Sequence, residues 1–129
     1  MNSIDDNPSP NGELSLQTIA MPKDTNASGD IFGGWLLSQM DISAAVAAGK
    51  VAGGRVATVA IDNMNFLVPV QVGAVVGCYT EVISVGRSSI QVIVEVWMDK
   101  GLTGKKIKVT EGLFVFVSID NNGRTRAVT

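Results

Sequence analysis

The stretch TNASGDIFGGWLLSQMDISAAVAAG, residues 25–49, joins a polar, glycine-rich loop to an apolar segment that carries one carboxylate, Asp41. The apolar residues predict a helix from about residue 34 to 48, and Gly49 stands where a left-handed C-cap is common. This helix is apolar around nearly its whole circumference, which is typical of a helix that is buried on most sides. A carboxylate in its middle therefore requires an explanation.

Four long segments after the helix alternate in polarity and are rich in Val and Ile, which predicts β-strands. A shorter segment of this kind precedes the helix at residues 13–20. The connections between the long strands are short and favour antiparallel neighbours, because a parallel crossover needs about a dozen residues or more. The sequence therefore predicts an α+β fold with a sheet of about five antiparallel strands and one helix. The long strands are expected at residues 55–70, 72–85, 88–99 and 106–120.

Composition limits the class of protein. The chain has 129 residues, of which 46% are hydrophobic and 17% charged, and this suits a single domain at residues 13–129 after a flexible segment at residues 1–12. The net charge is -2, and the scattered basic residues form no stripe that would bind nucleic acid. Neither a signal peptide nor an apolar run of about 18 residues is present. We therefore expect a cytoplasmic protein with no membrane partner.

The chain contains no histidine, which excludes a Ser-His-Asp triad, a Cys-His pair and an imidazole-ligated metal site. Its single cysteine, Cys78, lies in a predicted strand away from any helix start or cationic cluster. We expect Cys78 to be buried and structural. An enzyme of this composition has to rely on carboxylates, lysines, hydroxyls and backbone amides.

Two interpretations of Asp41 follow from its neighbours on the helix. Ala44 and Ala45, one turn later, form a stripe of small side chains beside Asp41, and another molecule or segment can approach this stripe closely. Asp41 is either a solvated carboxylate, or one that is satisfied by Ser38 and a neighbouring chain, or an acid that works with the free backbone N–H groups at the helix start. Those amides lie about two turns away, roughly 10 Å at about 1.5 Å per residue. A two-fold interface would bring the amides of one subunit towards the acid of another.

Four motifs occur in order between about residues 17 and 126, and they read AMPKDTNASGDIFGGWLLSQMD, VATVAIDNMNFLVPVQVG, VGRSSIQVIVEVW and FVFVSIDNNGRTR. Together they resemble the hotdog-fold acyl-CoA thioesterases, most closely the bacterial YciA type. The resemblance implies a curved antiparallel sheet around a long central helix, dimers that join their sheets, and commonly a trimer of dimers. It also implies acyl-CoA as the substrate, a free acid and CoA as the products, and no cofactor or metal.

The resemblance also implies roles for single residues. Asp41 corresponds to the general base that directs water at the thioester carbonyl. Asn26, Gly33 and Gly34 correspond to the loop positions that help to hold the thioester and its oxyanion. A turn that lies near the phosphates or pantetheine of CoA in such enzymes corresponds to Gly86, Arg87, Ser88 and Ser89. An arginine and hydroxyls suit phosphate oxygens.

Several alternatives stay open. Arg87 is equally explained as a solvated turn residue, and Arg124 and Arg126 are weaker candidates for the same contact. Asp30 is a rival acid, although an acid just before a helix more commonly caps it. Phe32 stands where several relatives have a histidine. The sequence does not distinguish a general base from direct attack by the carboxylate.

Two other functions also fit a hotdog fold. A dehydratase or hydratase acts on acyl thioesters but commonly relies on a histidine, which this chain lacks. A non-catalytic acyl-CoA-binding protein needs a groove and phosphate contacts but no acid at position 41. The resemblance therefore implies an acyl-CoA thioester hydrolase.

Overall fold

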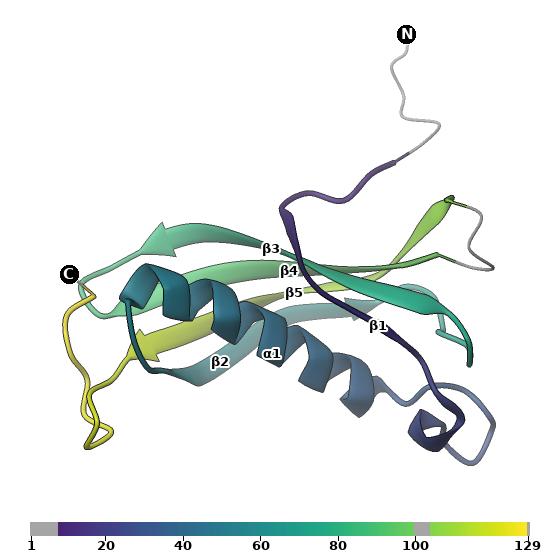
Figure 1. The fold of residues 1–129 in the computed structure, drawn as a ribbon, viewed down its shortest axis with the longest axis horizontal. Helices are drawn as coiled ribbons and strands as arrows, with labels where there is room; N and C mark the ends of the chain where they lie inside the picture. Colours follow the sequence, from purple (N-terminus) through teal and green to yellow (C-terminus); the bar gives the residue numbers. More distant parts are fainter. Residues whose placement is uncertain (1–7, 100–103, 129) are drawn as a thin grey trace, which may run out of the picture.

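The computed structural model describes residues 8–99 and 104–128 and consists of one twisted antiparallel sheet with a long helix against it (Figure 1). The predicted α+β architecture, with five strands and one long helix in the described part of the chain, is confirmed. The elements in chain order are β1 (Glu13–Ile19), the short 3-10 helix η1 (Pro22–Asp24), α1 (Gly33–Ala52), β2 (Val56–Phe66), β3 (Val75–Val85), β4 (Ser89–Asp99) and β5 (Lys106–Ser118).

The strand order in the sheet is β1-β3-β4-β5-β2, with every neighbouring pair antiparallel. The expectation that the short connection after β2 makes β2 and β3 neighbours is wrong, because β2 pairs with β5. Residues 67–74 instead cross the end of the sheet, bonding to Val109 near their start and to Ala20 at their end. A residue spans up to about 3.3 Å, so this segment is long enough to cross three strand spacings of about 4.8 Å each.

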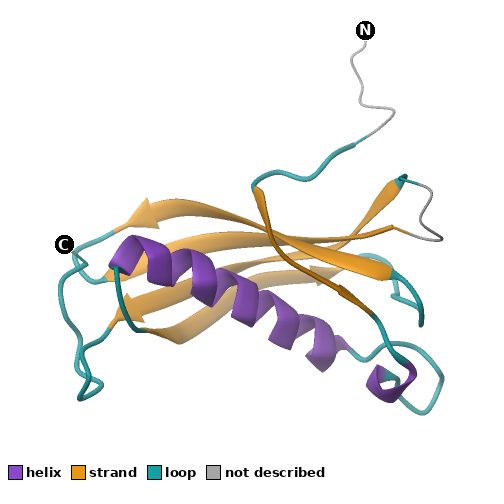
Figure 2. Cartoon of the chain, in the orientation of Figure 1, coloured by secondary structure: helices purple, strands orange, loops and turns teal. Residues whose placement is uncertain are grey.

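The hydrophobic core lies between α1 and one face of the sheet (Figure 2). Alternate residues of the central strands point towards the helix, and small helix residues let it approach closely. The fully buried residues include Met40, Ala44 and Ala48 of α1, Val92, Val94 and Val96 of β4, and Phe114 and Phe116 of β5. These contacts present one side of α1 to the sheet and leave its middle beside edge strand β2.

Two expectations about the helix are wrong. Gly49 does not end it, because α1 continues to Ala52, which is buried, and the left-handed C-cap is Gly53 with a φ of 67°. The helix is also not buried on most sides in the single chain. Ile42 is 52% exposed and Val46 is 47% exposed, so one apolar side of α1 lacks a cover among the described residues.

Some predicted segments lie partly outside the described residues. The structure does not describe residues 1–7, which belong to the predicted flexible segment, or residues 100–103, which belong to the connection after β4. In the described part of the predicted flexible segment, Asn11 donates two hydrogen bonds to Glu95.

No helix in the part of the chain that the structure describes has the length and apolar character needed to cross a membrane.

Candidate active site

Asp41 lies in the middle of α1 and contacts edge strand β2. The hydroxyl of Thr58 donates a hydrogen bond of 2.7 Å to its Oδ1 atom. Thr58 is opposite Phe116 in the sheet, and Phe116 is in the core, so Thr58 is on the face of the sheet that meets the helix. The Oδ2 atom of Asp41 has no hydrogen-bond partner within residues 8–99 and 104–128, and the side chain is half-buried.

This contact shows which side chain holds Asp41, and the catalytic role of Asp41 stays a prediction. The hydroxyl of Ser38 donates to the carbonyl of Trp35 at 2.8 Å, so Ser38 does not satisfy the acid. Sequence reasoning missed Thr58. In the sequence, Thr58 stands out only as a hydroxyl residue among Val and Ala at the start of a strand. The fold is needed to show that this residue lies opposite Asp41.

The start of α1 presents free backbone donors. Its N-cap is Phe32, with no side-chain cap, and Gly33 and Gly34 follow with exposed backbones. Neither glycine N–H has a hydrogen-bond acceptor in the described part of the chain. Asp30 is not the cap that its position predicts, because the N-cap is Phe32 and no side chain caps the helix. Uncapped N–H groups at a helix start are suited to hold a negatively charged oxygen.

Asn26 organises the loop before the helix. Its Oδ1 accepts hydrogen bonds from the backbone N–H groups of Ser28 at 2.9 Å and Asp30 at 3.1 Å. Its Nδ2 group is exposed and has no acceptor among the described residues. Asp24, a residue that sequence reasoning did not single out, anchors the other side of the loop, where it is buried and its carbonyl accepts from Phe32. Asn26 therefore shapes the loop with one atom and leaves a donor on another.

A hollow of about 320 Å³ opens beside the helix start. Its lining is apolar apart from backbone groups, and Phe66 and Leu67 at its rim are more than half exposed. The lining residues are Ile31, Gly33, Leu36, Phe66, Leu67, Val68, Pro69 and Val70. Such a surface can receive a hydrocarbon group next to the free amides of α1.

The turn between β3 and β4 is held closed by a hydrogen bond from Gly86 N to Ser89 O at 2.8 Å. A Cβ atom at Gly86 would lie 2.6 Å from the hydroxyl oxygen of Ser89, so a larger residue would distort the turn. The side chain of Arg87 is exposed and has no acceptor in the described ranges, and Ser88 and Ser89 are half-buried. Val128 donates to the carbonyl of Arg87 at 2.7 Å, which brings the C-terminal segment beside this turn.

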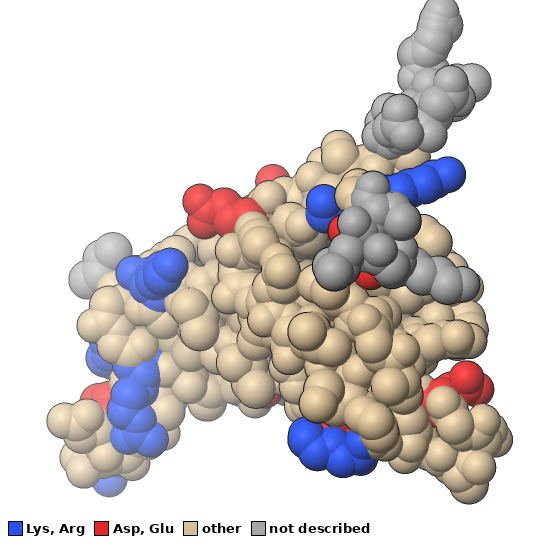
Figure 3. All heavy atoms as spheres, turned by 45° about the vertical axis from the view of Figure 1, so that its right-hand side comes forward, with Lys and Arg blue, Asp and Glu red and all other residues tan. Residues whose placement is uncertain are grey.

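Basic side chains gather at this end of the molecule, on the left in Figure 3. Arg126 donates to the carbonyl of Ala52 at 2.9 Å and to that of Ile119 at 3.3 Å, so it satisfies the C-terminus of α1. Arg124 is exposed. The three predicted arginines thus share one end of the fold, but the guanidinium of Arg126 is already engaged in holding the helix end.

Comparisons with known proteins identify the family of this chain. Residues 28–105 match the family model of the thioesterase superfamily. The chain belongs to this superfamily. The acyl-CoA thioester hydrolase YciA of Salmonella typhimurium is 52% identical over 120 residues, which are 91% of this chain and 90% of that protein.

Solved structures of similar proteins support the assignment of this chain to the thioesterase superfamily. The hexameric thioesterase of Yersinia pestis is 53% identical, with a TM-score of 0.89 and coverage of 94% of this chain and 98% of that one. The acyl-CoA hydrolase of Staphylococcus aureus, solved with butyryl coenzyme A and coenzyme A, is 30% identical with a TM-score of 0.81, covering 87% of this chain and 68% of that one. Variants of the latter with one asparagine or one aspartate replaced by alanine are also solved. The expected hotdog fold is confirmed.

Cys78 of this thioesterase superfamily member lies in the core, as predicted. Burial raises the pKa of its thiol to about 11, and a hydrogen bond with Ser43 lowers the pKa by less. A thiol with so high a pKa is a poor nucleophile at neutral pH. No group of three or more His, Cys, Asp or Glu residues in the described ranges is arranged to hold a metal ion.

Proposed function

We propose that the chain hydrolyses acyl-CoA thioesters to a free acid and CoA. The observation that carries this proposal is the hydrogen bond from Thr58 to Asp41, which orients a carboxylate at an open strand edge and leaves its Oδ2 atom available. The activity named for the Salmonella typhimurium relative supports the same reaction.

Asp41 acts as the general base. Its Oδ2 atom takes a proton from a water molecule while the water oxygen attacks the thioester carbonyl. The C–S bond then breaks, the carboxylic acid is released, and the CoA sulfur receives the proton. A general base of this kind contributes about a hundred- to ten-thousand-fold in rate.

Asn26, Gly33 and Gly34 supply hydrogen-bond donors to the thioester oxygen. Donors that point at the position of a developing negative charge stabilise the transition state. The roles of Asn26 and Asp41 are supported by the Staphylococcus aureus hydrolase, whose asparagine and aspartate variants are at positions 15 residues apart, the same separation as Asn26 and Asp41.

The active site is shared between two subunits. Gly34 precedes Asp41 by about two turns, roughly 10 Å along the helix, which is too far for both to contact one thioester carbonyl. Thr58 places Asp41 beside β2, and one side of β2 has no neighbouring strand in the described sheet. A two-fold axis at this edge would pair β2 with its copy and bring the loop of each subunit towards the acid of the other.

The two ends of the substrate extend away from Asp41 in opposite directions. The acyl group occupies the hollow beside the helix start, where Phe66 and Leu67 offer apolar surface. The phosphates of CoA contact Arg87, Ser88 and Ser89 in the turn between β3 and β4. Gly86 fits this turn because a Cβ atom there would lie too close to the Ser89 hydroxyl. Arg124 is a secondary contact, whereas Arg126 has a structural role at the helix end.

We also propose a homo-oligomer in which these dimers assemble into a hexamer. The Yersinia pestis relative, 53% identical over nearly its whole length, is hexameric. The apolar residue Ile42, which is 52% exposed on α1, is consistent with further burial on assembly.

Complementation between two inactive variants tests both the chemistry and the shared site. Asp41→Asn removes the base, and Asn26→Asp keeps the Oδ1 acceptor that shapes the loop but removes the Nδ2 donor. Each variant alone should release little thiol from acyl-CoA. In a mixed dimer one site carries both substitutions and the other carries neither, so we expect recovery of about half of the wild-type rate per mixed dimer.

A site contained in one chain predicts no recovery, because each protomer would then have one defect. Wild-type protein that releases no thiol from any acyl-CoA would refute hydrolysis itself. Retention of acyl-CoA binding in that case would favour the non-catalytic alternative.

A further inference from the structure

Strand β2 contains two extra residues relative to its partner β5. The pairing shifts by one residue between Thr58 and Ala60 and again between Asp62 and Asn65. Each shift is a β-bulge, in which two residues of one strand lie opposite one residue of the other. Bulges are frequent beside active sites, where they turn a side chain in a new direction. β2 is also the strand whose Thr58 holds Asp41.

The two bulges decide which side chains of β2 face α1. The residues that pair with or pack on the buried residues of β5 are Thr58, Ile61, Met64 and Phe66. A regular strand would present every second residue to the helix, and Asp62 would then be among them. Asp62 instead pairs with Leu113, which points away from the helix because its neighbour Phe114 is in the core. The bulges therefore direct a second carboxylate away from the face that meets Asp41.

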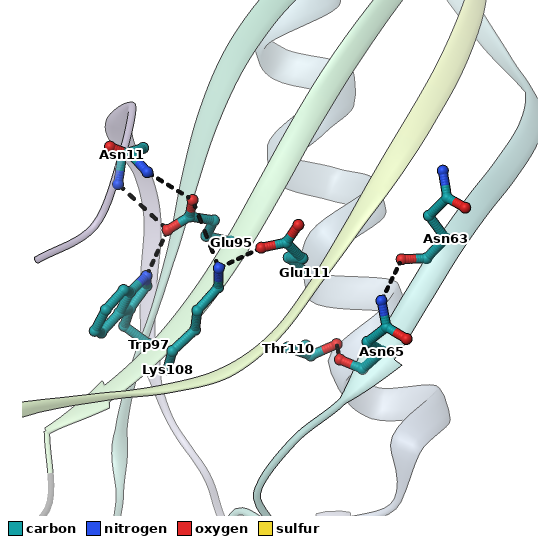
Figure 4. Close-up of polar contacts among 8 residues, drawn as sticks. All are labelled: Asn11, Asn63, Asn65, Glu95, Trp97, Lys108, Thr110 and Glu111. Atoms are coloured by element: carbon teal, nitrogen blue, oxygen red, sulfur yellow. Dashed lines mark hydrogen bonds and ion pairs between the residues drawn. The ribbon is translucent and has the colours of Figure 1, made fainter. Parts of the chain in front are cut away.

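Asn63 lies at the second bulge in a left-handed conformation, with a φ of 56°. No other residue with a side chain has a positive φ in the described part of the chain. Asparagine adopts this conformation more readily than most residues, and β-branched residues disfavour it. Figure 4 shows two bonds that hold the bulge: Nδ2 of Asn65 donates to the carbonyl of Asn63 at 3.3 Å, and the hydroxyl of buried Thr110 donates to the carbonyl of Asn65.

The bulge at Asn63 turns Phe66 towards α1. In a continuous strand after Asp62, which faces away from the helix, Phe66 would face away as well. With Asn63 as the extra residue, Phe66 pairs with buried Thr110, and its ring lies against the start of the helix. A Cβ atom at Gly33 would lie 3.5 Å from Cζ of Phe66, which is van der Waals contact.

This contact supports a backbone that has little else to fix it. Gly33 has no side chain, and its N-cap, Phe32, gives the helix no side-chain bond. Apart from chain neighbours and the helix backbone, Phe66 is the only described residue with an atom within 4 Å of the Cβ position of Gly33. Donors that stabilise a transition state work best when they are fixed before the reaction. The ring of Phe66 limits the motion of one proposed donor, the N–H of Gly33.

We propose that Asn63 is a positioning residue for hydrolysis, because its left-handed bulge places Phe66 on Gly33 and so fixes a donor to the thioester oxygen. The inference rests on the proposed function, in which Gly33 is such a donor. β2 then serves both parts of the chemistry, since its Thr58 end holds the base and its Phe66 end supports the donor. In the proposed dimer, two β2 strands related by a two-fold axis run antiparallel, so each site receives one end from each subunit.

Two substitutions at position 63 separate the conformation of the bulge from the side chain. Asn63→Gly accepts a positive φ and should keep kcat within about twofold of the wild-type value. Asn63→Val disfavours the bulge, and a return to regular alternation turns Phe66 away from Gly33. We expect its kcat to fall about tenfold, less than the roughly hundred- to thousandfold effect of removing such a donor. KM should change little, because the donor acts mainly in the transition state.

Thiol release from the shortest acyl-CoA that the wild-type protein hydrolyses measures these effects. A short acyl group makes little use of the hollow that Phe66 also lines, so a fall in kcat then reports on the donor.

A double-mutant cycle tests whether Asn63 acts through Phe66. Phe66→Ala removes the ring and should lower kcat about as much as Asn63→Val does. If the two residues act together, the doubly substituted protein loses no more than either single variant, whereas independent effects multiply. Asn63→Ala replaces the valine variant in the cycle if that variant does not fold.

Gly123→Val is the control for backbone strain alone. Gly123 has a φ of 78° in the turn after β5, and no described residue has an atom within 4 Å of its Cβ position, chain neighbours aside. This variant should lower the Tm, as Asn63→Val does, but retain the wild-type kcat.

A wild-type kcat in folded Asn63→Val, an equally slow Asn63→Gly, multiplied losses in the cycle, or the same fall in kcat for Gly123→Val would each overturn the inference. In all four cases an active wild-type protein leaves the proposed hydrolysis intact. Wild-type protein that releases no thiol from any acyl-CoA would refute the proposed function and this inference with it.

Discussion

Thr58 Oγ1 and Asp41 Oδ1 are 2.7 Å apart, and this hydrogen bond joins edge strand β2 to the middle of α1. The bond restricts the rotation of the Asp41 carboxylate and leaves one of its oxygens without a protein partner in the described part of the chain. Because β2 is at the edge of the sheet, the same bond ties the proposed base to the strand at which a second subunit is proposed to join.

Replacing Asp41 by asparagine should lower kcat by about a hundred- to ten-thousand-fold, because the amide cannot accept the proton of the attacking water. The fold should persist, since the asparagine Oδ1 still accepts the bond from Thr58. Thiol release and thermal unfolding measure the two effects. Asp30→Asn is the matched control and should stay near the wild-type rate. An Asp41→Asn variant with more than half of that rate would make Asp41 structural.

Removing the Thr58 hydroxyl tests its role in positioning Asp41. Thr58→Val keeps the shape of the side chain but removes a hydrogen bond to a charged group, which is worth about 1.5–3 kcal/mol. The expected fall in kcat/KM is therefore about 10- to 150-fold. Thr58→Ser retains the hydroxyl and should recover most of the loss. Equal kinetics for the valine and wild-type proteins would show that the bond is not needed for turnover.

Arg87→Ala should raise KM for acyl-CoA more than it lowers kcat, because phosphate is distant from the carbonyl and is bound similarly in the ground and transition states. The loss should be about 1.5–3 kcal/mol for a direct bond. A short thioester without the nucleotide should not respond to the substitution. Arg126→Ala offers a contrast, because it should lower the Tm by releasing the carbonyl of Ala52.

If the truncated thioester is impaired as much as acyl-CoA, Arg87 acts through the fold. The phosphate contact would then move to Arg124, whose side chain is exposed at the same end of the molecule.

Alkaline pH should destabilise the protein through Cys78. Burial raises the pKa of its thiol from 9.0 to about 11 in the folded state. As the pH rises from 9 to 11, the unfolded chain releases this proton while the folded chain retains it, so the free energy of unfolding falls. The fall should reach about 2–3 kcal/mol, at about 1.36 kcal/mol per pKa unit.

Urea unfolding between these pH values measures the slope. Cys78→Val removes the titration and should lose this part of the pH dependence, while other groups contribute equally to both proteins. The same slope in both proteins would show that Cys78 does not titrate as its burial requires.

Local patterns in the sequence were sufficient for the elements and for the central acid. Alternation in SSIQVIVEVW predicts β4, because successive side chains of a strand point to opposite faces regardless of its neighbours. Asp41 is visible as a charge among apolar residues. The end of α1 was misplaced at Gly49, because glycine is tolerated within a helix when later residues such as Ala52 are buried.

The tertiary structure alone decided which strand lies next to Asp41. The strands are similarly rich in Val and Ile, so their sequences do not specify an order in the sheet, and the short connection after β2 suggested β3 as its neighbour. Crossing the sheet end with residues 67–74 places β2 beside β5 and at the edge. In this arrangement Thr58, 17 residues from Asp41 in the chain, lies within 2.7 Å of the acid. Strand order depends on contacts between distant residues, which a local pattern does not contain.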